Sequence, residues 1–159
     1  MIILGIDPGS LNCGYGLLQV QKRRIVAAGS DVVKVSGDLP LAQRIALIYQ
    51  KINEVIEEYK PDIASVETIF YGKNIQSAFT LGHVRGAILL ALAQAEIKIV
   101  EYSPLEIKKS VVGNGKASKE QVGYMVQKIL SLKEPPKSQD ASDALAAAIC
   151  YYNKEKFYW

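Results

Sequence analysis

Residues 2–7 of the chain read Ile-Ile-Leu-Gly-Ile-Asp, and the turn-forming residues Pro8, Gly9 and Ser10 follow directly. A short, uninterrupted apolar run is typical of a β-strand that is covered on both faces of its sheet. Proline, glycine and serine end such a strand because each favours turn conformations. We therefore expect a buried central strand whose carboxyl end carries Asp7.

The rest of the chain predicts further strands and a set of helices. A glycine-bounded segment with Tyr15, Leu17 and Leu18 and a Val- and Ala-rich segment from Ile25 to Val35 predict two more strands, and short spacing between the three predicts an antiparallel meander. The predicted helix over 39–59 has six apolar residues on one face: Leu41, Ile45, Ile48, Ile52, Val55 and Tyr59. The other predicted elements are strands at 63–66 and 97–102 and helices at about 75–95, after Ser103-Pro104, from Ser118 and from Ser138 to Tyr152. This order predicts an α/β fold with a mixed five-stranded sheet flanked by helices.

Two glycine features stand out between these elements. Gly82 and Gly86 are four residues apart, so they share one face of the helix at 75–95 and predict a close approach of another element. Residues 111–116, Val-Val-Gly-Asn-Gly-Lys, predict a flexible loop.

Length and composition exclude several classes of protein. The chain has 159 residues, which predicts a single domain over 1–159. A hydrophobic share of 49% and a charged share of 22% exclude a largely disordered chain. We find no uninterrupted apolar run near the roughly 20 residues of a membrane span and no basic leader, and so expect a cytoplasmic protein without a membrane partner. Cys13 and Cys150 are then expected to be free, buried thiols.

Four acidic residues do not fit a simple solvated surface. Asp7 and Glu67 end two apolar strands, and Asp140 and Asp143 are three apart and share one helix face. Each alone has a structural explanation, such as a turn cap for Asp7 or a favourable helix N-terminus for Asp140. Together they predict a crevice of carboxylates, whose repulsion a divalent cation such as Mg²⁺ or Mn²⁺ would relieve. Such a set can hold two ions about 4 Å apart for phosphodiester cleavage.

Four motifs in this order resemble a known family. They are Gly5-Ile6-Asp7-Pro8-Gly9-Ser10 with Gly14-Tyr15-Gly16, the stretch from Glu67 to Asn74, residues 111–115, and the stretch from Gln139 to Ala146. The whole pattern resembles the bacterial RuvC Holliday junction resolvases and spans nearly the whole chain.

The resemblance implies a ribonuclease H-like fold and a Mg²⁺- or Mn²⁺-dependent endonuclease with two ions per active site. It implies a homodimer that makes paired symmetric cuts in four-way DNA junctions during recombination and repair, leaving a 5′-phosphate and a 3′-hydroxyl. It also implies a partnership with a RuvA/RuvB-type branch-migration complex. Carried over by motif, the catalytic and metal-binding acids are Asp7, Glu67, Asp140 and Asp143. Some relatives have His at the position of Asp140, whereas this chain has the four-acid version.

DNA contacts are predicted around the acids. The resemblance places a base-stacking aromatic at Phe70 and DNA-facing basic residues at Lys108 and Lys119. Independently, no acid occurs between Thr68 and Ala95 or between Ile107 and Lys119, which favours phosphate contact there. The full predicted set is Phe70, Tyr71, Lys73, Asn74, Lys108, Lys109, Lys116 and Lys119. The aromatics could instead be core residues, and the lysines could form an ordinary solvated surface.

The net charge of +3 comes from 19 basic and 16 acidic residues. If the four candidate acids hold metal, 12 acids remain against 19 basic residues and the rest of the chain is +7.

Three alternatives remain at this point. The segment Gly5–Ser10 also resembles the phosphate-binding segment of sugar kinases and actin-like ATPases, although those proteins pair two such domains and this chain has room for one. A non-catalytic junction-binding module is the second alternative, and a related nuclease acting on RNA or single strands is the third.

For the predicted dimer, we expect the interface on the helix at about 75–95.

Overall fold

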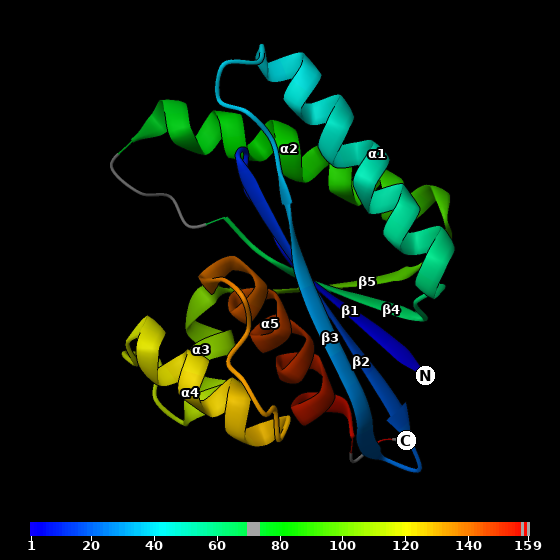
Figure 1. Cartoon of the computed structure of the whole chain (residues 1–159), viewed down its shortest axis with the longest axis vertical. Coiled ribbons are helices and arrows are strands. Elements are labelled where there is room, and N and C mark those ends of the chain that lie inside the picture. Colours follow the sequence, from blue (N-terminus) through cyan, green and yellow to red (C-terminus); the bar gives the residue numbers. More distant parts are fainter. Residues whose placement is uncertain (70–73, 157, 159) are drawn as a thin grey trace.

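The computed structural model of the chain contains one mixed sheet with helices on both of its faces (Figure 1), and it describes residues 1–69, 74–156 and 158. The strands are β1 (Ile2–Asp7), β2 (Asn12–Gln21), β3 (Arg24–Lys34), β4 (Ile63–Glu67) and β5 (Lys98–Tyr102). They lie in the order β3-β2-β1-β4-β5. Strand β1 is antiparallel to β2 and parallel to β4, and β4 is parallel to β5. The predicted meander and five-stranded mixed sheet are therefore confirmed.

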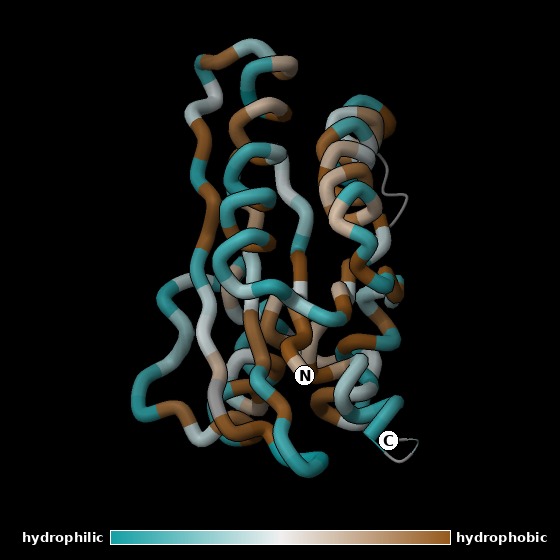
Figure 2. Tube along the Cα trace, turned by 90° about the vertical axis from the view of Figure 1, so that its right-hand side faces the viewer, coloured by the Kyte–Doolittle hydropathy of each residue, from teal (hydrophilic) through white to brown (hydrophobic). Residues whose placement is uncertain are grey.

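The helices form two layers. Helices α1 (Leu41–Tyr59) and α2 (Ile75–Gln94) cover one face of the sheet, and α3 (Pro104–Val112), α4 (Lys119–Ile129) and α5 (Gln139–Glu155) lie on the other (Figure 1). Each layer buries a hydrophobic core against the sheet. Along the trace, hydrophilic residues gather at turns such as the one between β2 and β3, while apolar residues recur along the strands (Figure 2). The predicted order of elements is confirmed.

Local chemistry explains where the helices on the second face begin. Ser103 and Ser118 each cap a helix, as predicted. The capping box between Ser118 and Gln121 follows the predicted spacing, and the structure adds a second one between Ser103 and Glu106. The Ser138 hydroxyl accepts a hydrogen bond from the Ala141 amide and starts α5. These caps satisfy amide groups that would otherwise lack a partner in the first helical turn.

Two predicted details at the ends of helices are wrong, and one predicted close approach inside α2 is not found among the described residues. The predicted loop at 111–116 begins later, because Val111 and Val112 complete α3 and its end falls at Gly113, with a φ of 82°. Only glycine adopts this left-handed conformation at little cost. Tyr59, expected on the buried face of the first long helix, is 38% exposed because it is the last residue of α1. A β-carbon built on Gly86, inside α2, would meet no atom within 4 Å among residues 1–69, 74–156 and 158, so the expected close approach is not found in this part of the chain.

Helix α2 corrects the expectation about membrane segments. It is long and apolar enough to cross a bilayer by length and composition, although Arg85 and several small polar residues interrupt its apolar run. In the fold, Val84, Ile88, Ala91 and Leu92 of α2 are fully buried in the core that it shares with α1 and the sheet. The helix is therefore an integral part of this α/β fold.

Helix α5 lies unusually close to β1 and β2. A β-carbon built on Gly14 would lie 2.0 Å from the Asp140 carbonyl oxygen, and one built on Gly5 would lie 1.9 Å from the Ala144 carbonyl oxygen. Glycine on the strands and alanine on the helix permit this distance because neither carries a bulky side chain. The buried Ser65 hydroxyl of β4 also donates a 2.7 Å hydrogen bond to the Ala147 carbonyl. The packing of α5 thus fixes its position over the centre of the sheet.

Candidate active site

The four predicted acids come from three elements that meet at one end of the sheet. Asp7 is the last residue of β1 and Glu67 the last residue of β4, and these strands are parallel neighbours. Asp140 lies in the first turn of α5, with Asp143 one turn further along. Because Gly14 pairs with Asp7 across the sheet and contacts the backbone of Asp140, the packing of α5 brings its acids beside Asp7.

The pKa of Asp7 is raised further from its ordinary value than the pKa of Glu67. Burial raises its pKa, and the negative charges of Glu67, Asp143 and Asp140 raise it further, to about 8. The Lys119 ammonium opposes this shift. Desolvation and like charges both disfavour a carboxylate, so negative charge at Asp7 is poorly compensated by the protein alone.

The pKa of Glu67, at the end of the neighbouring strand β4, is raised as well. Burial and the charge of Asp143 raise its pKa to about 7, while Lys119 and Lys108 act in the opposite direction. Two carboxyl groups that hold protons near neutral pH mark a place where a cation would bind favourably. Perturbed groups gathered in a cleft are a common sign of a functional site.

The Asp143 carboxylate has one hydrogen-bond partner and one ion-pair partner. Its Oδ1 accepts a 2.9 Å hydrogen bond from the Gln139 side chain, and its Oδ2 lies 3.6 Å from the Lys119 Nζ. Within residues 1–69, 74–156 and 158, no three His, Cys, Asp or Glu side chains already converge as metal ligands. The acids therefore lie within electrostatic reach of one another, but their oxygens are not yet gathered around a single point.

A pocket of about 180 Å³ opens over these acids. Its lining includes Asp7, Glu67, Asp143, Lys108 and Lys119. Apolar side chains from α3, α4 and α5 complete the wall. Asp140 is not part of this lining, and it acts on Asp7 through its charge. The pocket combines acids at its base with lysines from the α3–α4 region, a pattern suited to a phosphate group held beside a cation.

The other predicted DNA contacts lie in different places. Lys109 and Lys116 are exposed residues of α3 and of the loop that follows it, outside the pocket lining. Asn74 is the N-cap of α2, where its side-chain oxygen accepts a 3.1 Å hydrogen bond from the Ser77 amide. Phe70, Tyr71 and Lys73 lie outside the described residues. Sequence reasoning did not find the capping role of Asn74, although Asn before a helix is a recognised N-cap signal.

Arg85 is a basic residue of the acid-free stretch between Thr68 and Ala95, and the structure gives it partners within the chain. Its Nε donates a 3.3 Å hydrogen bond to the Glu67 carbonyl oxygen, and its guanidinium forms an ion pair with Glu101 of β5. Its side chain is 16% exposed. This contact with a candidate catalytic residue could not be read from sequence, because it joins residues from three elements.

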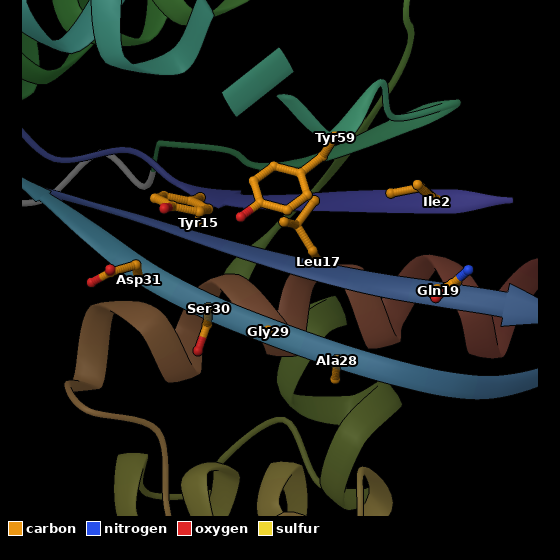
Figure 3. Close-up of a pocket in the computed structure, with 9 residues that line it drawn as sticks. All are labelled: Ile2, Tyr15, Leu17, Gln19, Ala28, Gly29, Ser30, Asp31 and Tyr59. Carbon is orange, nitrogen blue, oxygen red and sulfur yellow. The ribbon is translucent and has the colours of Figure 1, made fainter. Parts of the chain in front are cut away.

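A larger hollow of about 400 Å³ lies elsewhere, on the side of the sheet that faces α1 (Figure 3). Tyr15 and Leu17 of β2 and Tyr59 of α1 point into it. Among the described residues that line it, Asp31 is the only one with a charged side chain. A single carboxylate among apolar and neutral groups does not suit metal-assisted chemistry, so the smaller acidic pocket is the candidate active site.

Comparison with known proteins assigns the family. The family model for the crossover junction endodeoxyribonuclease RuvC matches residues 3–151. The chain belongs to the RuvC family. A crossover junction endodeoxyribonuclease RuvC of Chloroherpeton thalassium is 48% identical over 154 residues, covering 97% of this chain and 83% of the relative. A crossover junction endodeoxyribonuclease RuvC of Desulforamulus reducens is 44% identical over 151 residues, covering 95% of this chain and 93% of the relative.

A solved structure extends the similarity to three dimensions. The structure of Thermus thermophilus RuvC in complex with Holliday junction substrate matches with a TM-score of 0.89 and 32% identity, covering 99% of this chain and 96% of that chain. This RuvC match confirms the expected ribonuclease H-like fold. Membership of the RuvC family makes the chain a nuclease for Holliday junctions, which decides against the kinase-like and non-catalytic alternatives.

Proposed function

We propose that this chain cuts four-way DNA junctions by metal-assisted hydrolysis at the pocket formed by Asp7, Glu67, Asp140 and Asp143. The observation that carries the proposal is the convergence of three of these acids in one pocket, with the fourth acting on Asp7 through its charge. All four lie within the segment that matches the RuvC family.

The donor set fits a divalent metal. Oxygen ligands from carboxylates are what Mg²⁺ and Mn²⁺ prefer. The raised pKa values of Asp7 and Glu67 reflect negative charge that a cation would stabilise. Bound there, two divalent ions would supply a water activated at neutral pH and stabilise the charge on the departing oxygen. We assign Asp7 as the central ligand, with Glu67, Asp140 and Asp143 completing the set.

The basic residues of the site orient the substrate. Lys108 and Lys119 line the same pocket as the acids, so their ammonium groups can hold the phosphate that faces Asp7. We extend this surface to Lys109 and Lys116 and, as a prediction from the resemblance alone, to Phe70, Tyr71, Lys73 and Asn74. Phosphate contacts of this kind position the nucleic acid without reading its sequence.

A homodimer would supply two such sites for two symmetric cuts, and we propose α2 as its interface. Ile75, Phe79 and Leu90 of this helix are 71%, 67% and 53% exposed. None of the residues that the structure describes lies within 4 Å of a β-carbon built on Gly86, so a second copy could approach the helix backbone there. Exposed apolar side chains along one helix are a common feature of a protein interface.

We further propose that the chain forms one nuclease domain over residues 1–159. We propose that it acts with a RuvA/RuvB-type branch-migration complex in the cytoplasm, where bacterial chromosomes recombine.

The decisive experiment compares the wild-type chain with Asp7→Asn on a labelled mobile four-way junction in Mg²⁺. We expect Asp7→Asn to bind the junction and to lose cleavage, because the substitution replaces a ligand oxygen and keeps the shape of the side chain. Asp31→Asn, in the hollow on the other side of the sheet, is the matched control and should cut normally. Full cleavage by Asp7→Asn would refute the assignment.

End mapping and competition complete this test. Two symmetric nicks with 5′-phosphate and 3′-hydroxyl ends are expected on the junction. An excess of unlabelled single strands or RNA should compete poorly, and strong competition would instead favour a nuclease for those substrates.

A further inference from the structure

Arg85 of α2 contacts two neighbouring strands at the end of the sheet that carries the acids. Its Nε donates to the Glu67 carbonyl oxygen at 3.3 Å, and its guanidinium pairs with the Glu101 carboxylate. Glu67 ends β4, while Glu101 lies on β5 beside Val66, the residue before Glu67. The Arg85 side chain therefore joins α2 to the last residue of β4 and to the residue before the last in β5.

The main chain at Glu67 needs such a restraint. Strand β4 ends at this residue, and the chain leaves the sheet toward α2 directly afterwards. The next link to the sheet is the 2.9 Å hydrogen bond from the Thr68 amide to the Tyr102 carbonyl. Glu67 pairs with Tyr102 of β5, whereas the pairing of β4 with β1 ends at Val66, so a further bond to the Glu67 carbonyl restricts its backbone and the direction of its side chain.

The chemistry of Arg85 suits this task. A guanidinium presents several donors in a rigid, planar arrangement, so it can hold a carbonyl and a carboxylate at once. An ammonium is a single point charge and lacks this geometry. Burial lowers the pKa of Arg85, but arginine remains charged in proteins, and the Glu101 carboxylate compensates that charge.

We infer that Arg85 is a positioning residue that fixes the carboxyl end of β4 against α2 and thereby holds the Glu67 carboxylate in the acidic pocket. The inference rests on the proposed role of Glu67 in that pocket. The same contact joins the active-site end of β4 to α2, the helix proposed as the dimer interface.

The test uses the full chain and three variants that weaken this bridge in different ways. Arg85→Gln removes the charge, Arg85→Lys keeps the charge without the planar fork, and Glu101→Ala removes the exposed partner. Arg24→Gln, at the start of the edge strand β3, is the matched control for loss of an arginine charge. Glu101→Ala changes a partly exposed side chain, so it tests the bridge even if the Arg85 variants fold poorly.

The first measurement is hydrogen exchange in the protein without metal or DNA. We expect exchange at the Thr68 amide to become at least about tenfold faster in Glu101→Ala and Arg85→Gln, with Arg85→Lys in between, and to stay unchanged in Arg24→Gln. The second is Mn²⁺ binding by calorimetry, where loss of a supporting contact typically weakens affinity by about 10- to 100-fold. Junction affinity should change little, so the loss should fall on the cutting rate.

Unchanged exchange at Thr68 and unchanged Mn²⁺ affinity in the folded Arg85 and Glu101 variants would overturn the inference. Loss of thermal stability with both values intact would also overturn it, because Arg85 would then be a general structural residue. Glu67→Gln separates this outcome from a failure of the proposed function. If Glu67→Gln cuts normally, the role of Glu67 is wrong, whatever the exchange data show about Arg85.

Discussion

Gly14→Ala tests the close packing that brings α5 to the active site. The added β-carbon would lie 2.0 Å from the Asp140 carbonyl oxygen, whereas ordinary contacts begin at 3.4 Å. The first turn of α5 would therefore have to move by about 1.4 Å. Overpacking of this kind typically costs about 1–3 kcal/mol. For a chain of this size, that corresponds to a fall in Tm of about 3–10 °C.

The cleavage rate of Gly14→Ala should fall by more than its loss of folding stability alone would explain. Asp140 and Asp143 lie in the part of α5 that must move, and a displacement of about 1 Å in a catalytic group can reduce a rate by roughly 100-fold. The assay is single-turnover cleavage of a four-way junction at saturating Mg²⁺, well below the Tm of the variant. Gly29→Ala is the control, because its β-carbon would meet no atom within 4 Å.

Two outcomes would refute parts of this reasoning. A Gly14→Ala variant with the wild-type Tm and the wild-type rate would show that α5 does not approach β2 as closely as described. A variant with a lowered Tm and a normal rate would confirm the close approach and contradict the placement of the α5 acids in the active site.

Two further predictions concern charge. The pKa of Asp7 is raised from 3.8 to about 8 and that of Glu67 from 4.5 to about 7, so the folded state binds more protons than the unfolded state between these values. The stability of the metal-free protein should therefore fall as the pH rises from about 4 to about 8. Urea unfolding in a chelator should show a weaker fall for Asp7→Asn, and an identical slope would contradict the raised pKa. Lys119→Gln should move the acidic limb of the pH–cleavage profile to higher pH, because Lys119 lowers the pKa of both acids. It should also reduce the salt dependence of junction binding by about one phosphate contact, and an unchanged salt slope would exclude that contact.

The elements that could be predicted are those that depend on local sequence. Ser103 and Ser118 start their helices as expected, because an N-cap serine followed by proline and a capping box both depend only on residues within one helical turn. Asp7 and Glu67 meet because the strands that carry them are short, apolar and parallel neighbours, which the pattern of the chain indicates. The predicted order of elements and the acids at the ends of buried strands were sufficient to locate the candidate site.

The features that could not be predicted depend on contacts between distant elements. Nothing near Arg85 in the sequence indicates that it bonds the Glu67 carbonyl and pairs with Glu101. The exposure of Tyr59 likewise depends on where α1 ends relative to the sheet, because its heptad-like position alone favours burial. The open space at Gly86 among the described residues likewise depends on how distant elements pack, which its neighbours in the sequence do not indicate.

The packing of α5 on β1 and β2 also sets an order for biosynthesis. A ribosome that has released residues up to 130 has already exposed β1 to β5, including Asp7 and Glu67, but not the two acids of α5. The alanine-rich helix must then emerge and settle onto Gly5 and Gly14 before the acidic pocket is complete. Nascent chains therefore carry half of the candidate ligands without the rest until α5 has emerged and packed onto the sheet.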